Sequence, residues 1–74
     1  MEIHKIVKRI RTSLGLSQVA FAKQMHVSFS TINRWENGHA QPNRLAIVML
    51  IELCQRENIC RDCLPELKKF SENR

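Results

Sequence analysis

Two short segments, separated by only two residues, constrain the fold of this chain more than any other feature of its sequence. Ser17 is a favourable N-cap residue that opens residues 18–25, and Ser28 opens residues 29–37, which Gly38 ends. Each segment is too short to be stable as an isolated helix and must therefore pack on its neighbours. The sequence thus predicts two short helices joined by a tight turn.

Both segments carry apolar residues at helical spacing. Phe21, Ala22 and Met25 can share one buried face of the first segment, and Ile32 and Trp35 face inward from the second. Trp35 is expected in the core for this reason. The residues left for the outer face and margins of the second segment are Phe29, Ser30, Thr31, Asn33 and Arg34.

The flanking segments also have helical patterns. The first runs to Gly15, and its apolar positions are Ile3, Ile6, Val7, Ile10 and Leu14. Pro42 precedes a helix expected over residues 43–57, and a short final helix is expected at about 62–72, with Asp62 or Cys63 as its cap and Pro65 in its first turn. We therefore expect one compact all-α domain of five helices over residues 1–74.

The centre of the fourth predicted helix, residues 45–51, is apolar on every side. One face of a small domain cannot bury all of it. This pattern indicates a surface for a partner, which is either a second copy of the chain or another protein.

Charge and length exclude several classes of protein. Residues 1–44 hold seven basic and two acidic residues, whereas residues 45–74 hold five of each, as expected if the first part faces a polyanion rather than only solvent. No apolar run reaches the length of a membrane span and no signal peptide is visible, so we expect a cytoplasmic protein. No phosphate-binding loop, paired-histidine metal motif or activated nucleophile indicates an enzyme or a cofactor.

The three cysteines, Cys54, Cys60 and Cys63, cannot all pair within one chain. Cys60 and Cys63 have the spacing of half a zinc site, but the further ligands would have to come from histidines in other segments. We favour reduced thiols that pack the last helix and expect no metal.

A set of motif positions carries a family resemblance. Over about residues 4–57 the chain resembles the lambda-repressor-like helix-turn-helix family of the Cro or XRE type. The matching positions are Leu16, Ser17, Gln18, Ala22, Val27, Ser28, Thr31, Ile32, Trp35, Glu36, Asn37, Gly38 and Pro42. One departure is His26, where the family usually has glycine in the turn; histidine enters the left-handed conformation more readily than most residues, so the turn is expected to survive.

The resemblance implies that the helix over residues 28–37 lies in the major groove of duplex DNA. It implies base contacts by Ser28, Phe29, Ser30 and Arg34, with Arg34 on guanine and Phe29 on a thymine methyl group. The phosphate contacts that it implies are Gln18, Arg11, Arg9, Thr31, Asn33, Asn37 and Arg44, although Thr31 and Asn33 are equally expected to be merely solvated. It also implies a structural pair between Arg11 and Glu36.

These residues predict a transcriptional repressor that binds double-stranded DNA as a homodimer, without an effector site. Two alternatives stay open: an antitoxin that holds a toxin and represses its own operon, or the controller protein of a restriction-modification system.

Overall fold

The structure is a computed structural model that describes residues 2–72. These residues form five α-helices and one 3-10 turn, and they contain no β-strand. In chain order the elements are α1 (Ile3–Ser13), α2 (Gln18–Met25), α3 (Phe29–Glu36), α4 (Arg44–Glu57), η1 (Arg61–Cys63) and α5 (Leu64–Glu72). The predicted all-α, five-helix fold is therefore confirmed.

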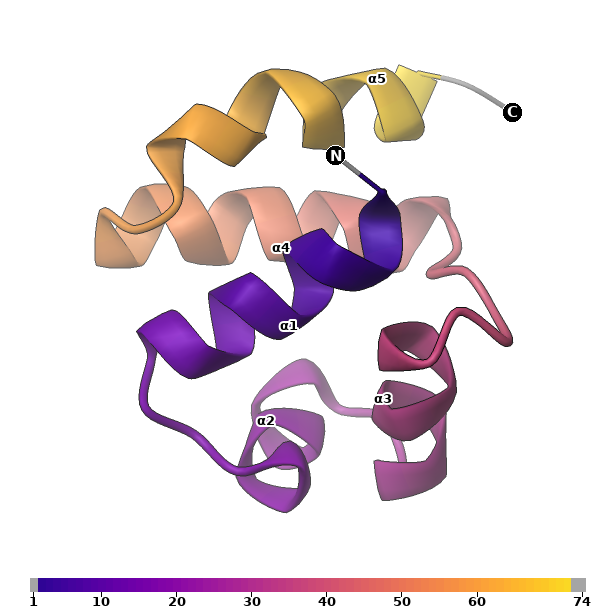
Figure 1. Cartoon of the computed structure of the whole chain (residues 1–74). Coiled ribbons are helices and arrows are strands. Elements are labelled where there is room, and N and C mark those ends of the chain that lie inside the picture. The colour runs from indigo at the N-terminus through magenta and orange to yellow at the C-terminus, as the bar shows by residue number, and fades with distance from the viewer. Residues whose placement is uncertain (1, 73–74) are drawn as a thin grey trace.

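The helices are arranged in layers around α4 (Figure 1). Helix α5 packs along α4 on one side, and the α2–α3 pair lies on the other side, with α1 crossing between them. Helix α1 contacts α3 directly, so α3 is supported from two directions. This arrangement leaves the remaining side of α3 facing outward.

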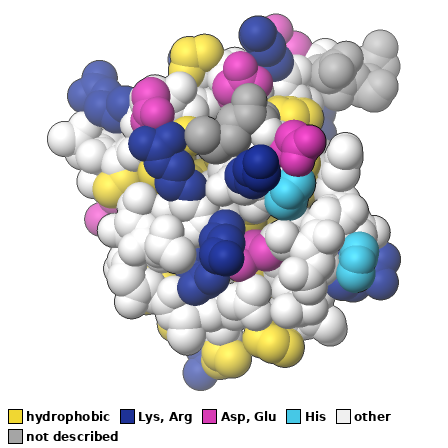
Figure 2. All heavy atoms as spheres, in the orientation of Figure 1, with side chains coloured by type: hydrophobic (Ala, Val, Ile, Leu, Met, Phe, Trp, Pro, Cys, Tyr) yellow, Lys and Arg dark blue, Asp and Glu magenta, His cyan; other side chains and the backbone are white. Residues whose placement is uncertain are grey.

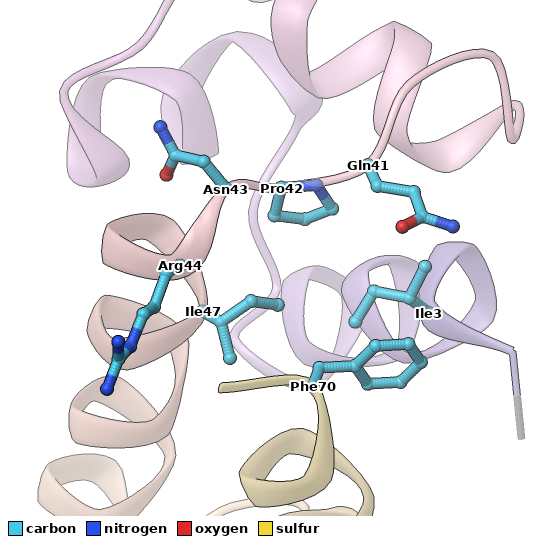
Figure 3. Close-up of a pocket in the computed structure, with 7 residues that line it drawn as sticks. All are labelled: Ile3, Gln41, Pro42, Asn43, Arg44, Ile47 and Phe70. Carbon is cyan, nitrogen blue, oxygen red and sulfur yellow. The ribbon is translucent and has the colours of Figure 1, made fainter. Parts of the chain in front are cut away.

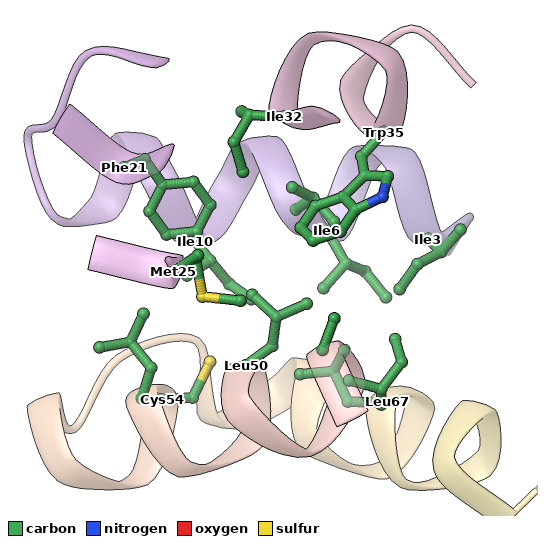
Figure 4. Packing of buried hydrophobic residues seen from close by; sticks show 14 of the residues in the cluster. Ile3, Ile6, Ile10, Phe21, Met25, Ile32, Trp35, Leu50, Cys54 and Leu67 are labelled. Atoms are coloured by element: carbon green, nitrogen blue, oxygen red, sulfur yellow. The ribbon is translucent and has the colours of Figure 1, made fainter. Parts of the chain in front are cut away.

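One hydrophobic core joins all five helices (Figure 4). Ile6 and Ile10 of α1, Phe21 of α2, Ile32 of α3 and Leu50 of α4 are all completely buried. Trp35, expected in the core, is 5% exposed. The apolar positions of the two short segments therefore face inward as their spacing predicts.

Side-chain caps define where three of the helices begin. The hydroxyl oxygens of Ser17 and Ser28 accept hydrogen bonds from the backbone N–H groups of Ala20 and Thr31, each at 3.1 Å. Asn43 Oδ1 accepts one from Ala46 N at 2.9 Å, so α4 begins at Arg44 with Asn43 as its cap. Each cap satisfies a donor that the first turn of a helix leaves unpaired.

The turn between α2 and α3 is tight and left-handed at His26, whose φ is 59° and ψ is 40°. Its N–H bonds to the carbonyl of Lys23, and that of Val27 bonds to the carbonyl of Ala22. These bonds close the end of α2 and redirect the chain within two residues. Histidine therefore occupies the position and the conformation expected for the usual glycine.

A 3-10 turn that the sequence did not indicate precedes the last helix. We predicted a helix at about residues 62–72 with Asp62 or Cys63 as its cap; α5 begins at Leu64, directly after Cys63, so the start near residue 62 and the Asp62 cap were wrong, and residues 61–63 form η1 instead. The cause is local: Cys60 is left-handed, with φ 48°, and its carbonyl accepts a hydrogen bond from Cys63 N at 2.9 Å. This three-residue spacing winds the chain more tightly than an α-helix.

Helix α4 cannot bury its whole apolar surface, as the sequence predicted. Leu45 is 68% exposed and Val48 is 37% exposed, whereas Ile47 and Leu50 lie in the core. At 14 residues α4 is the longest helix in the described part of the chain, and no helix there is long and apolar enough to span a membrane.

Candidate nucleic-acid interface

Helix α3 presents an outer face with few internal bonds. Phe29 is 49% exposed, and Ser30 and Arg34 are also exposed, one helical turn apart. Within residues 2–72 the Arg34 guanidinium forms no hydrogen bond or ion pair. An unengaged guanidinium on an exposed helix has all its donors available for a flat acceptor edge such as that of guanine.

Ser28 and Thr31 are tied to the helix itself. Their hydroxyl oxygens are 2.8 Å apart, and Ser28 Oγ also caps the helix through Thr31 N. Ser28 is exposed and Thr31 is half-buried. Their hydroxyls therefore hold the start of α3, and they lie at its edge beside Phe29.

Arg11 and Glu36 join α1 to the end of α3. Arg11 Nε donates to Glu36 Oε2 at 2.7 Å, and Nη2 donates to Oε1 at 3.0 Å. Arg11 Nη1 also donates to the carbonyl of Leu16 at 2.9 Å. The two side chains are only 15% and 4% exposed, so this two-pronged pair is largely shielded from water.

Gln18 and Asn33 extend this pair into a network across α2 and α3. Gln18 Nε2 donates to Glu36 Oε1 at 3.0 Å, and Asn33 Nδ2 donates to Gln18 Oε1 at 3.3 Å. Asn37 Nδ2 in turn donates to Asn33 Oδ1 at 3.1 Å. The structure thus brings together four of the residues predicted as phosphate contacts, namely Arg11, Gln18, Asn33 and Asn37.

The sequence analysis did not identify the bonds of Gln18 to Glu36 and Asn33. Gln18 lies on α2 whereas Asn33 and Glu36 lie on α3, and only the packing of α2 on α3 brings Gln18 to the other two. Spacing along the chain therefore carried no signal for these bonds.

The network keeps Glu36 ionised despite its burial. Burial alone raises the pKa of Glu36, but hydrogen bonds from Arg11 and Gln18 and the charges of Arg11 and Lys8 bring that pKa below its ordinary value. The hydrogen bond to Glu36 raises the pKa of Arg11. Both groups are therefore charged at neutral pH, and the ion pair is permanent there.

Arg9 lies in a different environment from Arg11. Its Nη1 is 2.7 Å from Asp62 Oδ2 and 3.4 Å from Cys63 Sγ, so its guanidinium is directed toward η1. The structure does not bring Arg9 together with the residues around α3. Asp62 was not identified as its partner from the sequence, because the pair is separated by 53 positions.

Arg44 is the first residue of α4 and lies on the rim of a shallow pocket (Figure 3). Ile3, Ile47 and Phe70 supply the apolar part of the lining, and Gln41 and Asn43 share the rim with Arg44. Arg44 is exposed, at the helix start that follows the loop after α3. A cation in this place is free to meet a phosphate.

The acidic side chains are unevenly distributed over the surface. In Figure 2 they lie mainly in the upper half, over α4 and α5, where basic side chains accompany them. The charged surface of the first 44 residues is by contrast almost entirely basic, since Glu36 is buried. Such a surface attracts polyanions.

The part of the chain between residues 2 and 72 offers no group of three or more histidine, cysteine, aspartate or glutamate side chains that could hold a metal ion. Cys54 and Cys63 are buried, and Cys60 is half-buried. The three thiols pack at the junction of α4, η1 and α5.

Two short helices joined by a tight turn, the second of which has an exposed outer face, define a helix-turn-helix DNA-binding domain. The family profile described as Helix-turn-helix matches residues 7–57. The chain belongs to this helix-turn-helix family, of the Cro or XRE type, whose domains bind DNA and are not enzymes.

Two curated proteins are similar to the chain. It is 37% identical to the HTH-type transcriptional activator BcrR of Enterococcus faecalis over 43 residues. These residues are 58% of this chain and 21% of that protein. It is 38% identical to Antitoxin HigA-2 of Vibrio cholerae serotype O1 over 47 residues. These residues are 64% of this chain and 44% of that protein. The matched segment thus spans less than half the length of either relative, and no solved structure gives a significant match.

Proposed function

We propose that the chain is a sequence-specific transcription regulator that inserts α3 into the major groove of duplex DNA. The outward face of α3 carries the proposal: Phe29, Ser30 and Arg34 are exposed on a helix whose other side is fixed in the core. In this proposal Arg34 reads a guanine, Phe29 packs on a thymine methyl group, and Ser28 and Ser30 contact adjacent base edges.

Phosphates on either side of the groove are held by the network and its neighbours. In this proposal the backbone N–H groups at the start of α2 bind one phosphate. The bonds of Gln18, the first residue of α2, to Glu36 and Asn33 hold that helix start in position. Asn37 and Arg44 flank the loop after α3 and hold the backbone there. Thr31 lies at the margin of α3, and Arg11 contributes mainly by fixing Glu36.

The first test is a titration of the purified chain against random duplex and against the DNA upstream of its own gene, at two salt concentrations. Sequence-specific regulation predicts tighter and less salt-sensitive binding to the upstream DNA. Weak, equal and steeply salt-dependent binding to both would contradict the proposal.

An arginine variant on α3 and a lysine variant on α5 separate base reading from the general electrostatic attraction to DNA. Arg34→Ala is expected to weaken binding to the cognate site by about 1–3 kcal/mol and to relax preference at one base pair. Lys69→Ala removes the same charge from the exposed surface of α5, and it should change both affinities little. Equal losses on cognate and random DNA for Arg34→Ala would exclude base reading by this residue.

We further propose that two copies bind a palindromic site and repress transcription by occupying the promoter. Support comes from the exposed Leu45 and Val48 and from the balanced charge of residues 45–74, which lets two copies approach without repulsion. A Leu45→Glu variant should dissociate the dimer in sedimentation experiments. In vitro transcription from the bound promoter then tests whether the protein represses or activates. Stimulated transcription would show an activator and contradict the proposed repression.

The similarity to Antitoxin HigA-2 favours a second candidate function, toxin neutralisation. A short reading frame beside the gene would then encode a protein that arrests growth when expressed alone. Co-expression of this chain should restore growth and yield a stable complex. Growth arrest that persists under co-expression, or no arrest at all, excludes this candidate.

A further inference from the structure

None of the three cysteines is among the residues proposed to contact DNA. Cys54 lies in the last part of α4 and is completely buried (Figure 4). Cys60 and Cys63 bracket η1, on the far side of α4 from α2 and α3. Two of these thiols, Cys60 and Cys63, are three residues apart in the chain and lie at the two ends of η1.

The backbone between Cys60 and Cys63 forms a turn that suits a disulfide. The hydrogen bond from Cys63 N to the Cys60 carbonyl, at 2.9 Å, closes a four-residue turn. Such turns bring their first and last Cα atoms within about 7 Å, and disulfides join Cα atoms roughly 4.4–6.8 Å apart. The backbone therefore needs little movement to bridge the two residues.

Both sulfur atoms face the same side of α1. Cys60 Sγ is 3.4 Å from Ser13 Oγ, and Cys63 Sγ is 3.4 Å from Arg9 Nη1. Arg9 and Ser13 are one turn apart on α1, so their side chains lie on one face of that helix. Each sulfur thus contacts a side chain from the same face of α1.

The three thiols differ in their access to an oxidant. Cys60 is half-buried, whereas Cys63 is 3% exposed and Cys54 is fully buried. Burial raises the pKa of Cys54 to about 12, which leaves almost no thiolate at neutral pH. Burial raises the pKa of Cys63 as well, and the charge of the Arg9 guanidinium beside it offsets only part of that effect.

We propose that Cys60 and Cys63 are a reversible oxidation site that forms an intrachain disulfide with hydrogen peroxide as the oxidant. The Cys60 thiolate attacks one peroxide oxygen, which gives a sulfenic acid and, after proton uptake, one water molecule. The Cys63 thiolate then attacks the Cys60 sulfur and displaces hydroxide, which leaves as a second water. Two thiols and one peroxide thus become one disulfide and two waters, and a thiol reductant reverses the reaction.

The proposed bond joins the two ends of η1 and therefore fixes the turn that connects α4 to α5. In a reducing compartment such a bond is transient and reports oxidative conditions. Formation also removes the thiol that receives the hydrogen bond from Arg9, so Arg9 keeps Asp62 as its partner.

Tryptic mapping tests the proposal on the full chain. The reduced protein is treated with hydrogen peroxide, the remaining thiols are alkylated, and the products are analysed by mass spectrometry without reduction. Trypsin cleaves after Arg44, Arg56, Arg61 and Lys68, so each cysteine falls on a different peptide. The expected product is a monomer that has lost two hydrogen atoms, in which peptide 57–61 is linked to peptide 62–68 and Cys54 is alkylated.

Two variants serve as matched controls. Cys60→Ser replaces the accessible thiol and should abolish the loss of hydrogen, while Cys54→Ala should leave the linkage between peptides 57–61 and 62–68 intact. A linkage through Cys54, a bond between two chains, or sulfinic acid at Cys60 without a disulfide would each overturn the proposal. The wild-type map decides the question even if the Cys54 variant does not fold.

Discussion

The pair between Arg11 and Glu36 provides the sharpest test of how α3 is held. Glu36 accepts three hydrogen bonds, two of them from Arg11, and its side chain is only 4% exposed. Arg11→Met removes the cation and leaves a buried carboxylate with Gln18 as its remaining side-chain donor. Loss of one partner from a buried ion pair costs about 3–5 kcal/mol, a large part of the stability of a domain this small.

The double variant separates the pair from the two single effects. Arg11→Met combined with Glu36→Leu removes both charges and keeps apolar volume, so it should be less destabilised than the sum of the single variants by about 2–3 kcal/mol. Urea unfolding of all four proteins at pH 7 measures this coupling. If the double variant equals the sum of the single variants, the two side chains do not interact and the network does not hold α3.

The pH dependence gives an independent check on the same pair. The pKa of Glu36 in the folded protein lies below its ordinary value of 4.5, so its stabilising effect is present above that value and is lost as the pH falls through the folded pKa. Arg11→Met removes an interaction that lowers this pKa. The destabilisation caused by Arg11→Met should therefore shrink as the pH falls from 7 to 3, and a constant difference would refute the explanation.

Three further predictions concern local features of the fold, and urea unfolding measures each of them. His26→Gly should stabilise the chain by about 0.5–1 kcal/mol, because glycine adopts the left-handed conformation of this residue without strain; a loss of stability would show that the histidine side chain contributes a contact. Ser28→Ala should cost about 1 kcal/mol through loss of the cap on α3, and Ser28→Gly only a few tenths; equal costs would argue against a capping role. Leu50→Ala should cost about 2–5 kcal/mol, whereas Gln55→Ala on the exposed side of the same helix should change stability by about 0.5 kcal/mol or less; similar values would contradict the assigned burial.

Much of the fold could be predicted because residues close to each helix end determine where that helix begins or stops. Ser17 and Ser28 cap the helices that they were expected to open, and Gly15 and Gly38 are left-handed, with φ of 70° and 76°, just after α1 and α3. These signals act within a few residues and need no tertiary structure.

The 3-10 turn before α5 and the hydrogen bonds of the network could not be predicted in this way. The 3-10 turn depends on the left-handed Cys60, a residue type that rarely signals such a conformation. The bond between Gln18 and Glu36 depends on the packing of α2 against α3. The sequence indicated that Gln18 belongs to the site, but only the three-dimensional arrangement shows which groups orient it.

The division of α3 into an anchored side and an open side has a consequence for how such a protein diverges. Ile32, Trp35 and Glu36 hold the helix, while Phe29, Ser30 and Arg34 contribute little to that anchoring. Replacements on the open side can therefore accumulate at small cost to folding. Under the proposed function, a lineage can in this way acquire a new target sequence by exchanging a few outward side chains, while the scaffold that presents them stays unchanged.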